Sequence, residues 1–147
     1  MEINDIITAI SIKLNRTFGD GYTNYIDEVP QGFQTPAFLI LFLNLENIRQ
    51  IGKRWKVTTL FNVQYFPSGG CADASNHTLK VQHALKEITL LNGSVMLGTE
   101  ANSEIVDGNA HNFIHFNFFL REVEAKTLMG SLRHYANGNE VATVGEE

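Results

Sequence analysis

The chain has 147 residues, of which 44% are hydrophobic and 18% charged, and its formal net charge is −5. This length fits one domain, and the acidic balance disfavours a nucleic-acid reader, which would need a strong basic patch. Cys71 is the single cysteine, so no internal disulfide can form, and no segment approaches the ~20 apolar residues that cross a membrane. We therefore expect one folded domain that is made in the cytoplasm and stays out of membranes.

The N-terminal part predicts a helix followed by strands. Apolar side chains recur there at helical spacing: Ile3, Ile6, Ile7, Ile10 and Leu14. Asn4 or Asp5 is placed to cap the first turn, and Gly19 to end the helix. Residues 22–29 then predict a short strand, and the apolar run 37–45 predicts a central one.

A long hairpin and a second helix are expected next. Residues 54–66 alternate between apolar and polar side chains, which is typical of a half-buried strand paired with the run before it. Asp73 or Ser75 could cap the second helix, and Asn92-Gly93 would end it. Its expected apolar stripe consists of Val81, Ala84, Leu85, Ile88 and Leu91.

The strongest local signal is the turn Asp107-Gly108, which predicts a two-residue hairpin between residues 94–106 and 109–121. Pairing outward from this turn predicts an apolar face made of these pairs: Ile105 with Ala110, Ala101 with Ile114, Thr99 with Phe116, Leu97 with Phe118, and Val95 with Leu120. On the opposite face the predicted pairs are Glu104 with His111, Asn102 with Phe113, and Glu100 with His115. That face is both polar and aromatic, so we expect it to meet a partner. Gly98 is interpreted as a bulge.

A third helix is expected at residues 124–135, and residues 137–147 have the composition of a disordered tail. The order of elements predicts an α+β fold: a mainly antiparallel sheet with long hairpins, flanked by helices. We expect one domain over residues 1–136.

The sequence predicts no catalytic, cofactor or metal site. His111 and His115 would share one face of a strand but lie ~13 Å apart, too far to hold one zinc ion, and each is expected to bond the glutamate opposite it. His77 and His83 are six residues apart in the expected helix and point to different faces. Cys71 is interpreted as a bystander thiol. The closest approach to a basic patch is the cluster of Arg49, Lys53, Arg54 and Lys56.

Several motifs, in this order, resemble one family over residues 6–120. The motifs are Ile6-Ile7-x-x-Ile10, Phe18-Gly19-Asp20-Gly21-Tyr22, Tyr25-Ile26-Asp27-Glu28-Val29-x-Gln31-Gly32, Pro36-x-Phe38, Val63-x-Tyr65-Phe66-Pro67 and Glu104-Ile105-Val106-Asp107-Gly108-x-x-His111. They resemble the tail terminators of contractile-tailed phages, prophages and tail-like bacteriocins of Gram-positive bacteria.

The resemblance implies a structural virion protein with a sheet flanked by helices and no cofactor or catalysis. Such a terminator forms a homohexameric ring that caps the tail tube, contacts the last ring of the tail sheath and offers a docking surface to the head-tail connector or collar. It would act in the tail or neck of the virion after assembly in the host cytoplasm, and DNA would only pass through its lumen.

Two groups of residues are the candidate interface with other subunits and with the tube. The first lies in Gly- and Pro-containing loops: Gln31, Phe33, Pro67, Ser68 and Gly69. The second lies on the polar and aromatic hairpin face: Glu100, Glu104, His111, Phe113 and His115. Two alternatives stay open from the sequence, namely another neck or head-tail completion protein and a small cytoplasmic ligand-binding domain.

Overall fold

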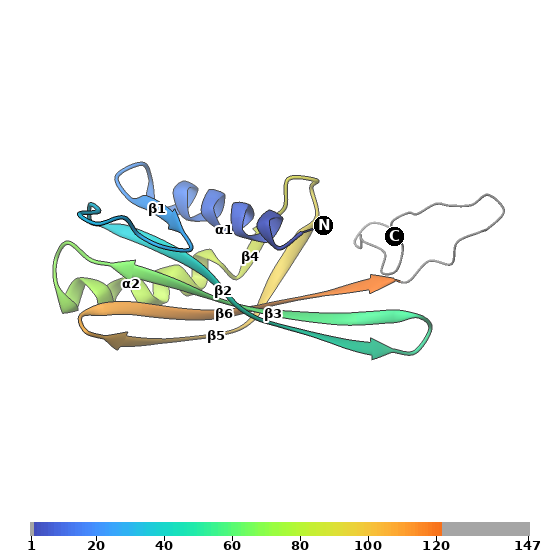
Figure 1. Cartoon of the computed structure of the whole chain (residues 1–147). Helices are drawn as coiled ribbons and strands as arrows, with labels where there is room; N and C mark the ends of the chain where they lie inside the picture. Colours follow the sequence, from blue (N-terminus) through green and yellow to red (C-terminus); the bar gives the residue numbers. More distant parts are fainter. Residues whose placement is uncertain (1, 122–147) are drawn as a thin grey trace.

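A curled six-stranded sheet with two helices organises residues 2–121, the part of the chain that this computed structural model describes (Figure 1). The strand order is β1-β2-β3-β6-β5-β4; β1 runs parallel to β2 and the other neighbours are antiparallel. The elements are α1 Ile3–Phe18, β1 Thr23–Ile26, β2 Ala37–Gln50, β3 Arg54–Phe66, α2 Cys71–Ala84, β4 Glu87–Thr89, β5 Val95–Val106 and β6 Asn109–Arg121. The predicted α+β class is confirmed. The helix expected at 124–135 and the tail at 137–147 lie outside the described residues.

Both helices pack on the same face of the sheet, and the core lies between them and the strands. The predicted alternation of β3 is confirmed, because Phe61, Val63 and Tyr65 are buried on this face. From α1, Ile6, Ile10 and Leu14 enter the same core, as do residues of α2. Fully burying an aliphatic or aromatic side chain of this size contributes about 1.5–3 kcal/mol, so this face holds the layers together.

Hydrogen bonds between residues close in the sequence fix both ends of α1. Gly19 ends the helix as predicted, with φ at 93° and its N–H donated to the carbonyl of Asn15 at 2.8 Å. The cap at the start is Glu2, two or three residues before the predicted Asn4 or Asp5. Asp5 instead accepts the backbone N–H of Glu2 at 2.8 Å, the reciprocal part of a capping box.

The second helix is shorter than its apolar stripe predicts. α2 is capped by Gly70, not by Asp73 or Ser75, and it ends at Ala84. The stripe continues into β4, where Ile88 pairs with Met96 of β5, and the predicted helix through 91 is therefore wrong. Ile88 is fully buried from this strand, whereas Leu91, which the longer helix would have placed on its apolar stripe, is 74% exposed.

The Asp107-Gly108 hairpin is confirmed, and its register is correct as far as Glu100. A bulge between Gly98 and Glu100 then shifts the pairing by one residue, so Gly98 lies opposite Phe116 and Leu97 opposite Asn117. The pairs predicted for Thr99, Leu97 and Val95 are wrong for this reason. Gly98 sits against the chain after α2 and donates its N–H to the carbonyl of Lys86 at 2.8 Å.

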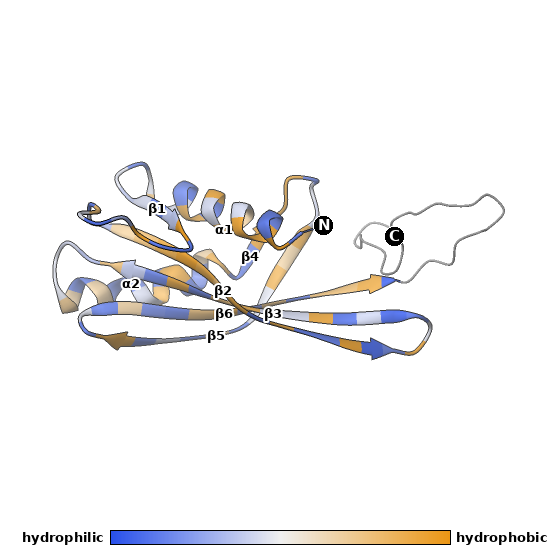
Figure 2. Ribbon diagram, in the orientation of Figure 1, coloured by the Kyte–Doolittle hydropathy of each residue, from blue (hydrophilic) through white to orange (hydrophobic). Residues whose placement is uncertain are grey.

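The β2–β3 hairpin extends past both helices (Figures 1 and 2). β2 runs on to Gln50, beyond the predicted end at Leu45, while β1 pairs with it only over residues 37–40. We call residues 43–58, which contain the turn and the adjoining halves of both strands, the arm. No helix within residues 2–121 is long and apolar enough to cross a membrane.

Replacing Gly98 should destabilise the fold. A Cβ at this position would lie 2.7 Å from the carbonyl oxygen of Leu85, so the alanine variant must displace backbone. We expect Gly98→Ala to lower the free energy of unfolding by about 1–3 kcal/mol, measured by chemical denaturation. Gly21→Ala is the matched control, since no atom lies within 4 Å of its Cβ, and equal stability of the two variants would contradict the close approach.

Candidate functional site

The predicted loop residues meet at one end of the sheet, which we call the loop end. Ala37 lies opposite Phe66, and Tyr65 opposite Ala110, so the loops before β2 and after β3 flank the β5–β6 turn. Gln31, Ser68 and Gly69 are exposed there, and Pro67 is half-buried. Phe33 has a packing role as well, because its ring meets that of Phe66 edge-on at 4.9 Å between centroids.

The other five predicted residues lie on the face of the sheet away from the helices, which we call the helix-free face. The register pairs Glu104 with His111 and Glu100 with His115 as expected. Both glutamates are exposed, whereas the histidines and Phe113 are half-buried. The structure thus brings these side chains onto one surface of the β5–β6 hairpin.

The hydrogen bonds predicted for the two histidines are not formed. His115 Nδ1 lies 3.9 Å from Glu100 Oε1, a distance for an ion pair of the protonated ring and too long for a hydrogen bond. His111 Nδ1 instead accepts the side-chain amide of Asn62 at 3.3 Å. Within residues 2–121 no three metal-ligating side chains gather to hold an ion.

Three buried polar atoms on the helix-free face have no hydrogen-bond partner among the described residues. They are Asn62 Oδ1, His115 Nδ1 and Asn117 Oδ1. Leaving a buried polar atom unpaired costs about 1–3 kcal/mol, and folded proteins contain few such atoms. Three of them on one face favour a surface that is completed by water or by a partner.

A buried polar cluster at the loop end was missed by the sequence analysis. His77 Nδ1 bonds the Asp73 carbonyl at 2.9 Å, so this nitrogen carries a proton, and in the neutral ring Nε2 accepts the hydroxyl of Tyr22 at 3.0 Å. The hydroxyl of Tyr65 donates to Asp73 Oδ2 at 3.0 Å. The spacing of Asp73 and His77 on one helix was a local signal, but Tyr22 comes from 55 residues away.

Asp73 and Tyr65 shift each other's proton affinity. Partial burial alone would raise the pKa of Asp73, but hydrogen bonds from Tyr65 and from the Gly69 N–H, with the nearby His77, lower this pKa below its usual value. Burial, together with the Asp73 carboxylate, raises the pKa of the Tyr65 hydroxyl well above its ordinary value. The ionised carboxylate therefore holds the loop after β3 and the start of α2 together.

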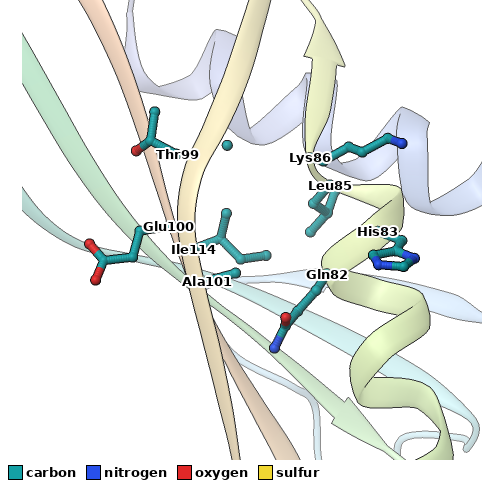
Figure 3. Close-up of a pocket in the computed structure, with 9 residues that line it drawn as sticks. Gln82, His83, Leu85, Lys86, Thr99, Glu100, Ala101 and Ile114 are labelled. Atoms are coloured by element: carbon teal, nitrogen blue, oxygen red, sulfur yellow. The ribbon is translucent and has the colours of Figure 1, made fainter.

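Two hollows in the described residues are open to solvent. One of about 210 Å³ lies between the end of α2 and the bulge of β5, lined by Gln82, His83, Leu85, Lys86, Gly98, Thr99, Glu100, Ala101 and Ile114 (Figure 3). In Figure 3 the Glu100 carboxylate points away from α2, so charged groups do not converge there. A second, of about 370 Å³ between α1 and the arm, is lined by Glu2, Ile3, Leu45, Asn47, Val57, Phe118 and Leu120. Neither gathers the convergent polar groups typical of an active site.

Comparison with known protein families shows to which family this chain belongs. A family model described as "Phage tail terminator protein" matches residues 5–127, which include most of α1 and all of α2 and β1–β6 of the described residues. The chain belongs to the phage tail terminator family. The resemblance drawn from the sequence motifs is confirmed. A tail terminator acts in the tail or neck of the virion, in contact with other tail components. No curated protein matches this sequence.

Removing the Asp73 side chain should destabilise this terminator. Asp73→Ala leaves the buried hydroxyl of Tyr65 without its acceptor, and we expect a loss of roughly 1–3 kcal/mol in the free energy of unfolding. Asp20→Ala, at an exposed position in the turn after α1, is the control. A change no larger than that of the control would show that the cluster contributes little.

The same carboxylate predicts a pH dependence. Because the pKa of Asp73 is lower in the folded than in the unfolded state, its ionised form stabilises the fold fully above the unfolded value of 3.8. This stabilisation is lost as the pH falls through the lower, folded pKa. The difference in the free energy of unfolding between the parent and Asp73→Ala should therefore be full at neutral pH and shrink as the pH falls below about 4. A constant difference across this range would contradict the assignment.

Proposed function

We propose that this protein forms a homohexameric ring that caps the tail tube, stops its polymerisation and provides the docking surface for the head-tail connector or collar. In a contractile tail the same ring contacts the last ring of the sheath. The observation that carries the proposal is the family match over residues 5–127, which spans the described fold. The sequence motifs add the contractile-tail context, because they resemble terminators of that class.

The surfaces of the subunit suit a ring. A closed ring uses heterologous contacts, in which two different patches of each subunit meet. We assign one patch to the helix-free face of the β5–β6 hairpin, with Glu100, Glu104, His111, Phe113 and His115. The half-buried ring of Phe113 and the unpaired buried polar atoms of this face support the assignment. A neighbouring subunit could cover the ring and form hydrogen bonds with the polar atoms.

The loop end is the proposed contact with the stacked rings. Gln31, Ser68 and Gly69 are exposed there beside Phe33 and Pro67. The cluster of His77, Asp73 and Tyr65 lies beneath these loops and fixes the start of α2. A stiff loop end suits a docking surface, since less conformational entropy is lost when it binds.

We further propose that the protein acts by shape and carries out no catalysis. Its side chains would offer few phosphate contacts to DNA in the lumen, in keeping with the net charge of −5. Low affinity for phosphate would let DNA slide through the ring. Assembly would take place in the host cytoplasm, where the tail tube is completed.

Deleting the gene should release control of tail length. We expect tails of abnormal or uncontrolled length that lack attached heads, measured as length distributions in electron micrographs, with restoration by a plasmid copy. Normal particles in the deletion strain would refute the proposal. Tails of normal length without heads would point instead to another neck or head-tail completion protein.

Replacing three residues of the hairpin patch should weaken ring closure. We expect the combined change Glu100→Ala, Glu104→Ala and Phe113→Ala to reduce assembly on tails while far-ultraviolet circular dichroism stays unchanged, since Phe113 is half-buried and both glutamates are exposed. Assembly is measured as the amount of protein that sediments with purified tails. Leu79→Ala, at an exposed position on α2, is the control. Undiminished assembly would remove these residues from the interface.

A further inference from the structure

The sheet has two uncovered strand edges, and they lie on opposite sides and at opposite ends. β1 covers the outer side of β2 only over residues 37–40, which leaves residues 41–50 without a neighbouring strand among residues 2–121. β4 covers the outer side of β5 only over residues 95–97, so residues 98–106 are likewise uncovered by any described strand. The first edge runs into the arm and the second toward the loop end (Figure 1). Uncovered edges of this length are ready templates for pairing with another chain.

The arm and the β5–β6 hairpin differ in charge. The arm carries Arg49, Lys53, Arg54 and Lys56 against one acidic residue, Glu46. The β5–β6 hairpin carries Glu100, Glu104 and Asp107, with no lysine or arginine between residues 99 and 115. Oppositely charged surfaces at opposite ends of one subunit attract each other between copies, whereas two arms or two hairpins repel.

Two arginines of the arm are held in position over aromatic rings, and Arg54 and Lys56 share a face of the sheet with the glutamates. The guanidinium of Arg54 lies 4.5 Å from the ring centroid of Phe119, and that of Arg49 lies 5.5 Å from that of Trp55. Trp55 and Val57 point to the helix side, so Arg54 and Lys56 lie on the helix-free face, as do Glu100 and Glu104.

The arm also exposes several large apolar side chains. Ile48 is 48% exposed, and Ile51 at the tip is 94% exposed. Leu43 and Leu45 are exposed as well. Clustered apolar exposure of this kind marks a surface that binds another protein.

We propose that the arm of one subunit lies along the uncovered edge of β5 in the next subunit, so that the sheet continues across the subunit boundary. This inference rests on the proposed ring and names its second patch. β2 and β5 are antiparallel within the subunit, so copies in the same orientation would pair these edges antiparallel. The contact joins two different surfaces, and its repetition closes a ring.

Charge reversal provides the test. An arm-reversed variant carries Arg54→Glu and Lys56→Glu, and a hairpin-reversed variant carries Glu100→Lys and Glu104→Lys. The control carries Arg16→Glu and Lys80→Glu, at exposed positions on the two helices. Each full-length variant is expressed in the deletion strain, alone or with a second variant under a different tag, and circular dichroism of the purified protein checks its fold.

We expect each reversed variant alone to yield about tenfold fewer tails of normal length, because like charges then meet at every boundary. Co-expression of the two variants should restore normal tails, with both tags on the same particles, since alternating subunits in an even-numbered ring meet only opposite charges. The chain carrying all four changes should also restore them, and the control should behave as the parent.

Normal tails from either reversed variant alone would overturn the proposal, as would correctly folded variants that fail to rescue each other. Neither outcome affects the proposed capping function, which stands or falls with the gene deletion. If the deletion strain made normal tails, the capping function would fail, and co-purification of the two tagged variants would still report the contact between copies.

Discussion

The length of the strands relative to the helices is the constraint on which this structure depends. A 14-residue strand such as β2 extends about 45 Å, whereas a 16-residue helix such as α1 extends about 24 Å. Two helices of this size therefore cover the half of the sheet near the loop end and leave the rest of the strands without a layer. The arm, its exposed apolar side chains and the hollow beside α1 all follow from this mismatch.

The covered half is fixed by contacts that join distant parts of the chain. Tyr22, Tyr65 and His77 pack their rings together, and Asp73 bonds the hydroxyl of Tyr65, so the starts of β1 and α2 and the end of β3 form one rigid unit. Gln82 donates to Ser103 at 2.7 Å, and Ser103 donates to the buried Asn112 at 2.6 Å, which ties α2 to β5 and β6. Rigidity is thus concentrated where the loops are displayed.

Local chemistry determined the parts that the sequence predicted correctly. The positive φ values of Asp107 and Gly108 fix the turn, and the side-chain alternation then sets the faces as far as Glu100. The grouping of Glu100, Glu104, His111, Phe113 and His115 on one face followed from that register alone. Whether these residues meet another subunit is a property of the assembly and stays a prediction.

The errors lie where a tertiary contact overrides a local pattern. The stripe of Leu85 and Ile88 fits a helix, but the edge of β5 offers Ile88 a strand partner, and Ile88 is fully buried there. Gly98 was correctly interpreted as a bulge, yet its effect on the register depends on the chain at Leu85 and Lys86, which no turn signal encodes. His77 was interpreted as unremarkable because its partners Tyr22 and Tyr65 come from other elements.

An uncovered, apolar strand edge is a hazard for a protein that stays alone, because any extended chain can pair with it. The arm contains no proline, and among residues 2–121 no strand pairs with the outer edge of β2 over residues 41–50. Its charge does distinguish partners, since two basic arms repel each other while the acidic hairpin of another copy attracts the arm. Under the proposed pairing, these charges favour one orientation of neighbouring subunits, which is the property that an assembling ring requires.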